Sequence, residues 1–256
     1  AAAAERHPAA GLWLLTDADI GHHPAELRRM VARLLADNLD MASLMVRLAT
    51  ATVAEKLIVP AFVFFFRMLY PFRWVADPGR PTAAAAGGYI LIRRAMLDRV
   101  GGVAAISGAL IDDCSLAALV KGHGGRLSLA LSQDTVSLRG YDGFLPLWKM
   151  IARSAYTQLN CSPALLAGTV AAMGIVFVLP PAAALLRGSL PGWLAWMAMS
   201  VAYLPMLRAY RASGLLAPLL PLIAVFYLGA TVDSARRHWQ GRGGEWKGRI
   251  QAGGGA

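Results

Sequence analysis

The sequence contains few charged residues and almost no cysteine. Only 16% of its 256 residues are charged and 57% are hydrophobic, a balance too apolar for an ordinary soluble domain. The two cysteines, Cys114 and Cys161, exclude a framework of several disulfides and fit a reducing compartment.

Acidic residues are also scarce, since 15 of them face 25 lysines and arginines and leave a formal net charge of +10. Several basic residues form arginine pairs beside apolar runs, at Arg28-Arg29, Arg93-Arg94 and Arg236-Arg237, without any nucleic-acid-binding motif. A cytoplasmic membrane surface, whose anionic lipids attract Lys and Arg, explains this pattern better than DNA or RNA. We therefore expect a membrane and no nucleic acid as partner.

Charge is almost absent from residues 162–235, where uncharged runs cover 164–186, 188–207 and 212–232. Each run is long enough to span a bilayer as a helix, although internal prolines predict kinks or shorter spans. A soluble helical core is the alternative. The basic residues that follow place the C-terminal tail in the cytoplasm by the positive-inside rule. Three spans would put that tail and the polar domain on opposite sides, so either one run is re-entrant or the boundaries differ.

The polar part opens with an apolar strand at residues 12–15, and Asp17 and Asp19 follow directly. Two carboxylates at positions i and i+2 after a strand leave it on the same side. There they can hold Mg²⁺ or Mn²⁺ against a diphosphate, because these cations take protein carboxylates together with phosphate oxygens. A solvated turn is the ordinary alternative for two such acids.

Alternating apolar patterns predict a mixed α/β domain. We expect helices over residues 25–36, 51–70, 93–100, 112–121 and 144–159, and strands over 41–46, 89–92, 126–131 and 135–138. The helix at 51–70 contains Pro60 and an aromatic run too short to span a bilayer, and it is read as either an interfacial helix or a buried core helix.

Two further features are candidates for a site. Gly87 and Gly88 precede a strand and allow either a ligand or another backbone to come close. Asp112 and Asp113 open a helix, where acids are also favoured by the helix dipole without any function. His22 and His23 follow the first pair of acids, but a solvated turn explains them more simply than a metal site.

Taken together, a set of motifs occurs in a fixed order. They are Thr16-Asp17-Ala18-Asp19-Ile20, Pro60-Ala61-Phe62-Val63-Phe64-Phe65-Phe66, Leu69-Tyr70-Pro71-Phe72-Arg73-Trp74-Val75, Thr82-Ala83-Ala84-Ala85-Ala86-Gly87-Gly88, Leu110-Ile111-Asp112-Asp113-Cys114, Ser137-Leu138-Arg139, Arg153-Ser154-Ala155-Tyr156-Thr157-Gln158-Leu159 and Trp246-Lys247-Gly248-Arg249. In this order they resemble the membrane-bound family 2 glycosyltransferases of GT-A fold, most closely the hopene-associated glycosyltransferases.

This resemblance implies a fold and an arrangement of domains. We expect an α/β, Rossmann-like partial GT-A catalytic domain with interfacial helices at 1–160, transmembrane helices at 161–235 and a basic cytoplasmic tail at 236–256. The resemblance also implies upstream nucleotide-binding strands, so we read the sequence as N-terminally truncated and expect it to bind donor poorly by itself.

The resemblance further implies roles for individual residues. Asp17 and Asp19 hold the metal, Mg²⁺ or Mn²⁺, and the donor diphosphate, with Asp19 the more direct ligand. Asp113 is the general base and Asp112 orients the acceptor or its neighbour. Gly87 and Gly88 shape the donor and acceptor pocket. Arg153 contacts the diphosphate, although Ser154 follows it where processive and ceramide-type relatives have Trp.

The function implied is that of an inverting glycosyltransferase in the bacterial inner membrane, multi-pass, with its catalytic domain in the cytoplasm. The donor is a nucleotide-sugar such as a UDP-sugar, and the acceptor is a hopanoid or polyisoprenoid-like lipid. Two alternatives are a processive polysaccharide synthase and a non-catalytic membrane scaffold.

Overall fold

The computed structural model describes residues 6–7, 9–243, 245–246 and 249–250. The chain forms two compact units, and each is built from two stretches of sequence. The first unit contains Ala1–Ala49 and Arg67–Arg139, and the second contains Thr50–Phe66 and Gly140–Ala256.

The first unit is built on a five-stranded sheet with strand order β1-β4-β3-β5-β2. Strands β1, β3 and β5 run in one direction, because β4 is antiparallel to both β1 and β3, and β3 is parallel to β5. The short β2 pairs antiparallel with β5 at one edge. The strands are β1 (Leu12–Leu15), β2 (Ile20–Gly21), β3 (Met41–Arg47), β4 (Ile90–Arg93) and β5 (Leu127–Ser137).

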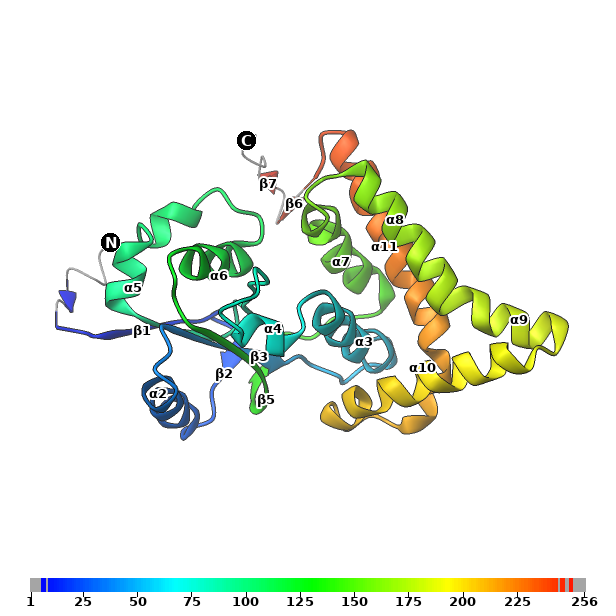
Figure 1. Cartoon of the computed structure of the whole chain (residues 1–256), viewed down its shortest axis with the longest axis horizontal. Helices are drawn as coiled ribbons and strands as arrows, with labels where there is room; N and C mark the ends of the chain where they lie inside the picture. Colours follow the sequence, from blue (N-terminus) through cyan, green and yellow to red (C-terminus); the bar gives the residue numbers. More distant parts are fainter. Residues whose placement is uncertain (1–5, 8, 244, 247–248, 251–256) are drawn as a thin grey trace. The chain divides into compact units, whose positions relative to one another are not determined.

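Helices cover both faces of this sheet. Helix α2 (Glu26–Ala36) lies on one face and α6 (Asp112–Gly122) lies on the other (Figure 1). Met30 and Leu34, one helical turn apart, place the apolar side of α2 in a core with strand residues such as Leu44 and Leu91. The remaining elements of the unit are α4 (Phe72–Ala76), α5 (Arg94–Arg99) and η1 (Val103–Ile106).

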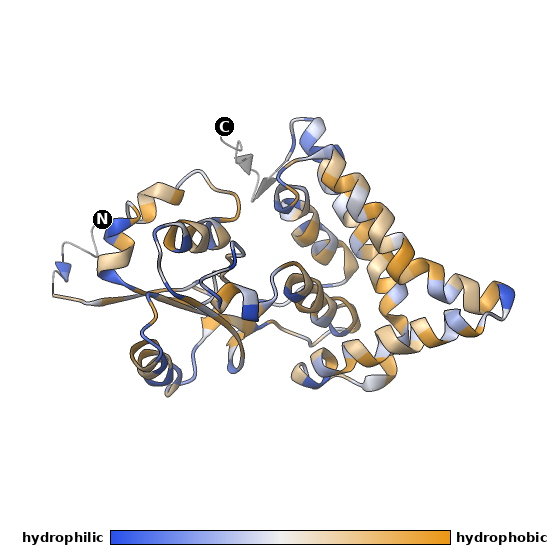
Figure 2. Cartoon of the chain, viewed as in Figure 1, coloured by the Kyte–Doolittle hydropathy of each residue, from blue (hydrophilic) through white to orange (hydrophobic). Residues whose placement is uncertain are grey.

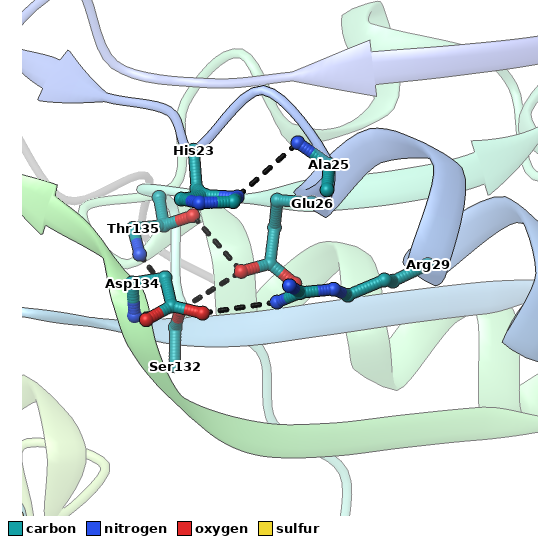
Figure 3. A network of polar contacts seen from close by, with 7 residues as sticks. All are labelled: His23, Ala25, Glu26, Arg29, Ser132, Asp134 and Thr135. Carbon is teal, nitrogen blue, oxygen red and sulfur yellow. Dashed lines mark hydrogen bonds and ion pairs between the residues drawn. The ribbon is translucent and has the colours of Figure 1, made fainter.

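The sequence pattern misses two features of this sheet. It does not predict the two-residue β2, and it divides β5 at residues 132–134, although β5 is one strand with a register shift. A polar network keeps the strand continuous there (Figure 3). Ser132 and Thr135 both donate 3.2 Å hydrogen bonds to the buried carboxylate of Glu26. Arg29 pairs with Asp134 at 2.9 Å, so the polar residues are held by α2 and do not end the strand.

The second unit is helical in the part of the chain that the structure describes up to residue 243. It comprises α3 (Val53–Leu69) as far as Phe66, α7 (Phe144–Gln158), α8 (Pro163–Met173), the π-helical turn η2 (Gly174–Val178), α9 (Leu179–Arg187), α10 (Leu190–Ala209), the 3₁₀ segment η3 (Gly214–Leu219) and α11 (Leu220–Trp239). Two short strands, β6 (Glu245–Trp246) and β7 (Arg249–Ile250), follow. Lys247 and Gly248, the centre of the predicted basic motif, lie outside the described residues.

Three helical segments are long and apolar enough to cross a membrane: Pro163–Arg187, Leu190–Ala209 and Gly214–Trp239 (Figure 2). The first is α8, η2 and α9 in succession. Its wide π turn directly precedes Pro180 and Pro181, which lack the N–H groups that an α-helix needs. The α/β fold followed by apolar helices of membrane length is therefore confirmed.

The third apolar helix continues to Trp239, beyond the predicted span end at residue 232. Asp233 stabilises this extension, because its carboxylate accepts hydrogen bonds from Arg236 and Arg237 at the i+3 and i+4 positions. The arginines also lie in the last turn, where positive charge is favoured by the helix dipole.

The aromatic run of α3 packs inside the second unit. The Phe65 ring lies 5.5 Å from that of Phe177 and 4.9 Å from that of Tyr227, and Phe64 lies 5.3 Å from Tyr203. The start of α3 is fixed by Glu55, whose buried carboxylate accepts hydrogen bonds from residues 51, 52 and 141. These contacts favour the core-helix interpretation for the inner side of α3.

Candidate active site

The candidate site lies in the first unit, at the carboxyl ends of the co-directional strands. After β1, residues 16–19 cross this end of the sheet and reach β2 at the opposite edge. Thr16 fixes the start of the crossing by donating a 2.9 Å hydrogen bond to the carbonyl of Gly88, and the carbonyl of Asp19 fixes its end by accepting from the N–H of Leu138 at 2.8 Å. Ligands of open α/β sheets bind at such carboxyl ends.

Asp17 and Asp113 meet at Gly87. A Cβ atom placed on Gly87 would lie 3.6 Å from Oδ2 of Asp113 and 4.0 Å from Oδ2 of Asp17. Residues from the β1–β2 crossing, the loop before β4 and the first turn of α6 therefore converge on one point. The absence of a side chain at Gly87 leaves the space between the two carboxylates open.

Asp113 is held by backbone donors. Its Oδ2 accepts a 2.9 Å hydrogen bond from the N–H of Gly87, and its Oδ1 accepts one of 2.7 Å from the N–H of Cys114. Burial raises the pKa of Asp113, and the charge of Asp112 adds to the increase, whereas the two N–H groups oppose it. The result is an oriented carboxyl group whose pKa lies above its usual value.

Cys114 and Tyr70 complete the surroundings of Asp113. Burial and the negative charge of Asp113 raise the pKa of the Cys114 thiol to about 12. At neutral pH the thiol therefore keeps its proton, and it hydrogen-bonds both Asp113 and Tyr70. Burial also raises the pKa of the Tyr70 hydroxyl, so this residue remains neutral as well.

The segment before β4 is pinned against the unit on both sides. The Ser43 hydroxyl donates to the carbonyl of Ala86 at 3.2 Å and accepts from its N–H at 2.9 Å. The ammonium group of Lys121 donates to the carbonyls of Trp74, Val75 and Thr82. Gly87 is thus presented by a fixed backbone, as a preorganised site requires.

Gly88 has a different environment from Gly87. A Cβ atom on Gly88 would lie 2.9 Å and 3.1 Å from the two methyl groups of Val46 and 3.4 Å from Ile20. Of the two interpretations of this glycine pair, close packing therefore describes Gly88, and an open space beside the carboxylates describes Gly87.

The other predicted site residues are placed as follows. Asp112 is exposed, and its carboxylate accepts a 3.0 Å hydrogen bond from the N–H of Asp113. Asp19 is partly buried at the end of the crossing loop. Arg153 lies in α7 of the second unit, whereas the carboxylates belong to the first.

The chemistry of the acids fits a divalent cation shared with a ligand. Among the residues that the structure describes, no group of three or more His, Cys, Asp or Glu side chains gathers around one point. Mg²⁺ commonly takes only one or two protein carboxylates and completes its shell with phosphate oxygens and water. Asp17, exposed beside Gly87, and Asp19 on the same loop can supply those oxygens.

Sequence reasoning missed Thr16 and Tyr70 as parts of this site. Thr16 bonds the Gly88 carbonyl and lies 3.0 Å from Nε2 of His22, which gives that histidine a structural partner. Both Thr16 and Tyr70 lie inside the quoted motifs, but only the fold shows which other motif each one touches. Cys114, taken from sequence as a small buried residue, is in contact with Asp113.

Comparison with known proteins gives the family. Among curated proteins none matches the chain. The family model described as glycosyl transferase family 21 matches residues 2–227, which include both units and every residue of the candidate site. The match covers most of the 256 residues, and its extent agrees with an α/β unit joined to apolar helices. The chain belongs to glycosyl transferase family 21.

Proposed function

We propose that the chain transfers a sugar from a nucleotide-diphosphate donor to a membrane lipid, with inversion at the anomeric carbon. The observation that carries this proposal is the pair of carboxylates, Asp17 and Asp113, on either side of Gly87. One carboxylate is exposed on a loop and the other is buried and oriented, so the two can perform different tasks.

Asp113 is the proposed general base. It takes the proton of the acceptor hydroxyl while that oxygen forms a bond to the anomeric carbon. On the opposite side of this carbon the bond to the diphosphate oxygen breaks, and the diphosphate leaves with the electron pair. The N–H groups of Gly87 and Cys114 hold both oxygens of Asp113 in place during this step.

Asp17 and Asp19 are the proposed ligands of Mg²⁺ or Mn²⁺ and, through it, of the donor diphosphate. The cation supplies positive charge that stabilises the leaving diphosphate. Asp112, one residue before the base, is proposed to orient the acceptor. Arg153, in the second unit, is proposed to contact the diphosphate.

The apolar helices support a lipid acceptor at a membrane. We propose a UDP-sugar as donor, a lipid of the hopanoid or polyisoprenoid kind as acceptor, and the bacterial inner membrane as location, with the catalytic domain in the cytoplasm. These finer assignments rest on the resemblance of the ordered motifs to the hopene-associated glycosyltransferases.

The test is a transfer assay on membranes from cells that express the gene. Membranes are incubated with labelled UDP-sugars and Mg²⁺ or Mn²⁺, and label is counted in the extracted lipid. The Asp113→Asn variant is expected to lose activity roughly 10²–10⁴-fold, the usual contribution of a general base. The control is Asp98→Asn, which removes an exposed acid of the same unit paired only with Arg94 among the printed ion pairs.

Full activity of Asp113→Asn would show that another group is the base. Label that appears only in a long polymer would instead identify a processive synthase. If no lipid is labelled with any UDP-sugar although the membranes hold folded protein, the donor or acceptor class is wrong.

A further inference from the structure

The first and last apolar segments of the second unit meet at one end. Cys161, directly before α8, has its sulfur 4.0 Å from Nδ1 of His238 in the last turn of α11. The ring of Tyr156 lies 5.3 Å from that of His238 and 5.8 Å from that of Trp239. The chain therefore enters and leaves its apolar region at the same place, which excludes three simple crossings in succession.

Helix α11 is the most enclosed of the three candidate spans. In its apolar window 39% of residues are buried inside the protein, against 22% for α10 and 11% for α8–α9. The side chains that cover it come from α7 along much of its length: Phe144 and Trp148 contact Phe226, and the Tyr156 N–H donates to the Ser234 hydroxyl at 3.1 Å.

The helices that enclose α11 are not membrane spans themselves. Helix α7 carries the exposed Lys149, and it follows Gly140 without any intervening apolar segment. Helix α3, whose Ile58 carbonyl accepts a 3.0 Å hydrogen bond from Tyr227 of α11, joins the first unit covalently at both ends of residues 50–66. The α11 residues beside these helices therefore lie at the surface of the bilayer and not in its core.

Charge on α11 supports the same location. Asp233 accepts a 2.9 Å hydrogen bond from the indole N–H of Trp148 and pairs with Arg236 and Arg237. Intramembrane charges are costly, and Trp is enriched at membrane–water interfaces. With these residues in water or headgroups, the apolar part of α11 is too short for a full crossing.

Helices α9 and α10 form a tight hairpin. A Cβ atom on Gly192 would lie 2.7 Å from the backbone nitrogen of Ala184 and 2.8 Å from the carbonyl oxygen of Pro180, so only glycine permits this approach. Gly188 ends α9 in the left-handed conformation, and the Ser189 side chain caps α10. The turn also carries the exposed Arg187.

The outer surface of this hairpin is apolar (Figures 1 and 2). Leu186 is 84% exposed, Leu190 68% and Met197 60%. The other end of the hairpin returns to the enclosed helices, because Tyr203 of α10 contacts Phe64 of α3. Segments of 25 and 20 residues reach about 37 Å and 30 Å as helices, enough for a bilayer core of about 30 Å.

We propose that α8–α9 and α10 cross the membrane out and back as a hairpin, while α11 stays with α3 and α7 at the surface from which the hairpin starts. The partner of the exposed apolar hairpin surface is the acyl-chain region of the bilayer, and Arg187 lies in the headgroups of the far leaflet. Two crossings place the polar residues before α8 and the basic residues after α11 on one side. This topology does not depend on the sugar or acceptor.

The test is the reactivity of single cysteines with a membrane-impermeant maleimide, applied to intact cells and to inverted membrane vesicles. Cys114 and Cys161 are replaced by alanine, and cysteine is introduced separately at Lys149, Ser189, Ser213 and Gln240. Each variant is accepted only if it elutes as a monodisperse species in detergent.

Positions 149, 213 and 240 are expected to react from one side and position 189 from the other. Three crossings would place 213 with 149 but 240 with 189, and a crossing α11 with a surface-bound α10 would place 213 with 189. A hairpin that stays inside one leaflet would leave 189 unreactive from both sides. Each of these three patterns overturns the proposal.

Discussion

The backbone N–H of Gly87 donates a 2.9 Å hydrogen bond to the carboxylate of Asp113. The bond joins the loop before β4 to the first turn of α6 and fixes the proposed base at the carboxyl end of the sheet. Since Gly87 also faces Asp17, one glycine both positions a carboxylate and keeps the space beside it free.

The two neighbouring glycines are expected to respond differently to the same substitution. In Gly87→Ala the methyl group has ordinary contact distances to Asp113 and Asp17, so the fold persists, but the methyl occupies the space between the carboxylates. We expect thermal stability close to wild type and transfer activity lower by on the order of 10²-fold, as for a misplaced reacting group.

In Gly88→Ala the methyl group meets Val46 at 2.9 Å inside the core. Overpacking of this kind costs about 1–3 kcal/mol, so we expect a lower melting temperature. Thermal unfolding and the lipid-transfer assay, measured on both variants, check the pair. Equal loss of stability in both would contradict the distinction between the two glycines.

The raised pKa of Asp113 predicts the acid side of the pH profile. A general base acts only when ionised, so kcat/KM is expected to fall, as pH decreases, at a higher pH than an ordinary aspartate with a pKa of about 3.9 would give. Burial is the largest cause of the raised pKa, and the charge of Asp112 adds to it.

Asp112→Asn removes that added charge and is expected to move the acid limb to lower pH, whatever its effect on the maximal rate. Asp98→Asn is the matched control and is expected to leave the limb in place. An acid limb that does not move in Asp112→Asn would show that the titrating group is not Asp113.

The sequence pattern located most elements but not their contacts. The strand at residues 12–15 and the helix at 25–36 follow from apolar periodicity, and they were predicted closely. Strand β2 has only two residues, too few to show any periodicity, and it exists because β5 extends far enough to pair with it. The polar interruption in β5 looks like a turn until Glu26 and Arg29 are seen to hold it.

The candidate site was predicted in part for a similar reason. Paired acids after a strand and at a helix start are visible in a sequence, whereas the choice between Gly87 and Gly88 depends on which one faces Val46. The contact of Tyr70 with Cys114 depends on tertiary packing between distant segments, which no local pattern encodes.

Glu55 is expected to stabilise the second unit as an ionised group. Burial opposes its charge, but hydrogen bonds from Thr52, Tyr141 and Ala51 outweigh this effect and lower its pKa. A lowered pKa in the folded state means that the stabilisation is present above the unfolded-state pKa and is lost as pH falls through the folded-state pKa.

We therefore expect Glu55→Gln to lower stability by roughly 1.5–3 kcal/mol at neutral pH, the usual range for hydrogen bonds to a charged group. The difference between wild type and variant should shrink as the pH falls below about 4, because wild type then loses its charge too. Thermal melts at several pH values measure this, and a difference independent of pH would contradict the assignment.

The contact between α7 and α11 gives a last prediction, based on Trp148 and Gly229. A Cβ atom on Gly229 would lie 2.7 Å from the edge of the Trp148 indole, whose N–H donates to Asp233. Gly229→Ala alone is expected to cost about 1–3 kcal/mol through overpacking. Trp148→Phe alone is expected to cost about 1 kcal/mol, because it removes the hydrogen bond while Asp233 keeps Arg236 and Arg237.

The double variant should cost less than the sum of the two single changes, because the smaller phenyl ring makes room for the new methyl group. Neighbours in contact commonly show such coupling, of about 0.5–3 kcal/mol, in a double-mutant cycle measured by thermal or denaturant unfolding. Additive effects would show that the indole does not lie over Gly229. The enclosure of α11 by α7, on which its position at the membrane surface depends, would then lose its main support.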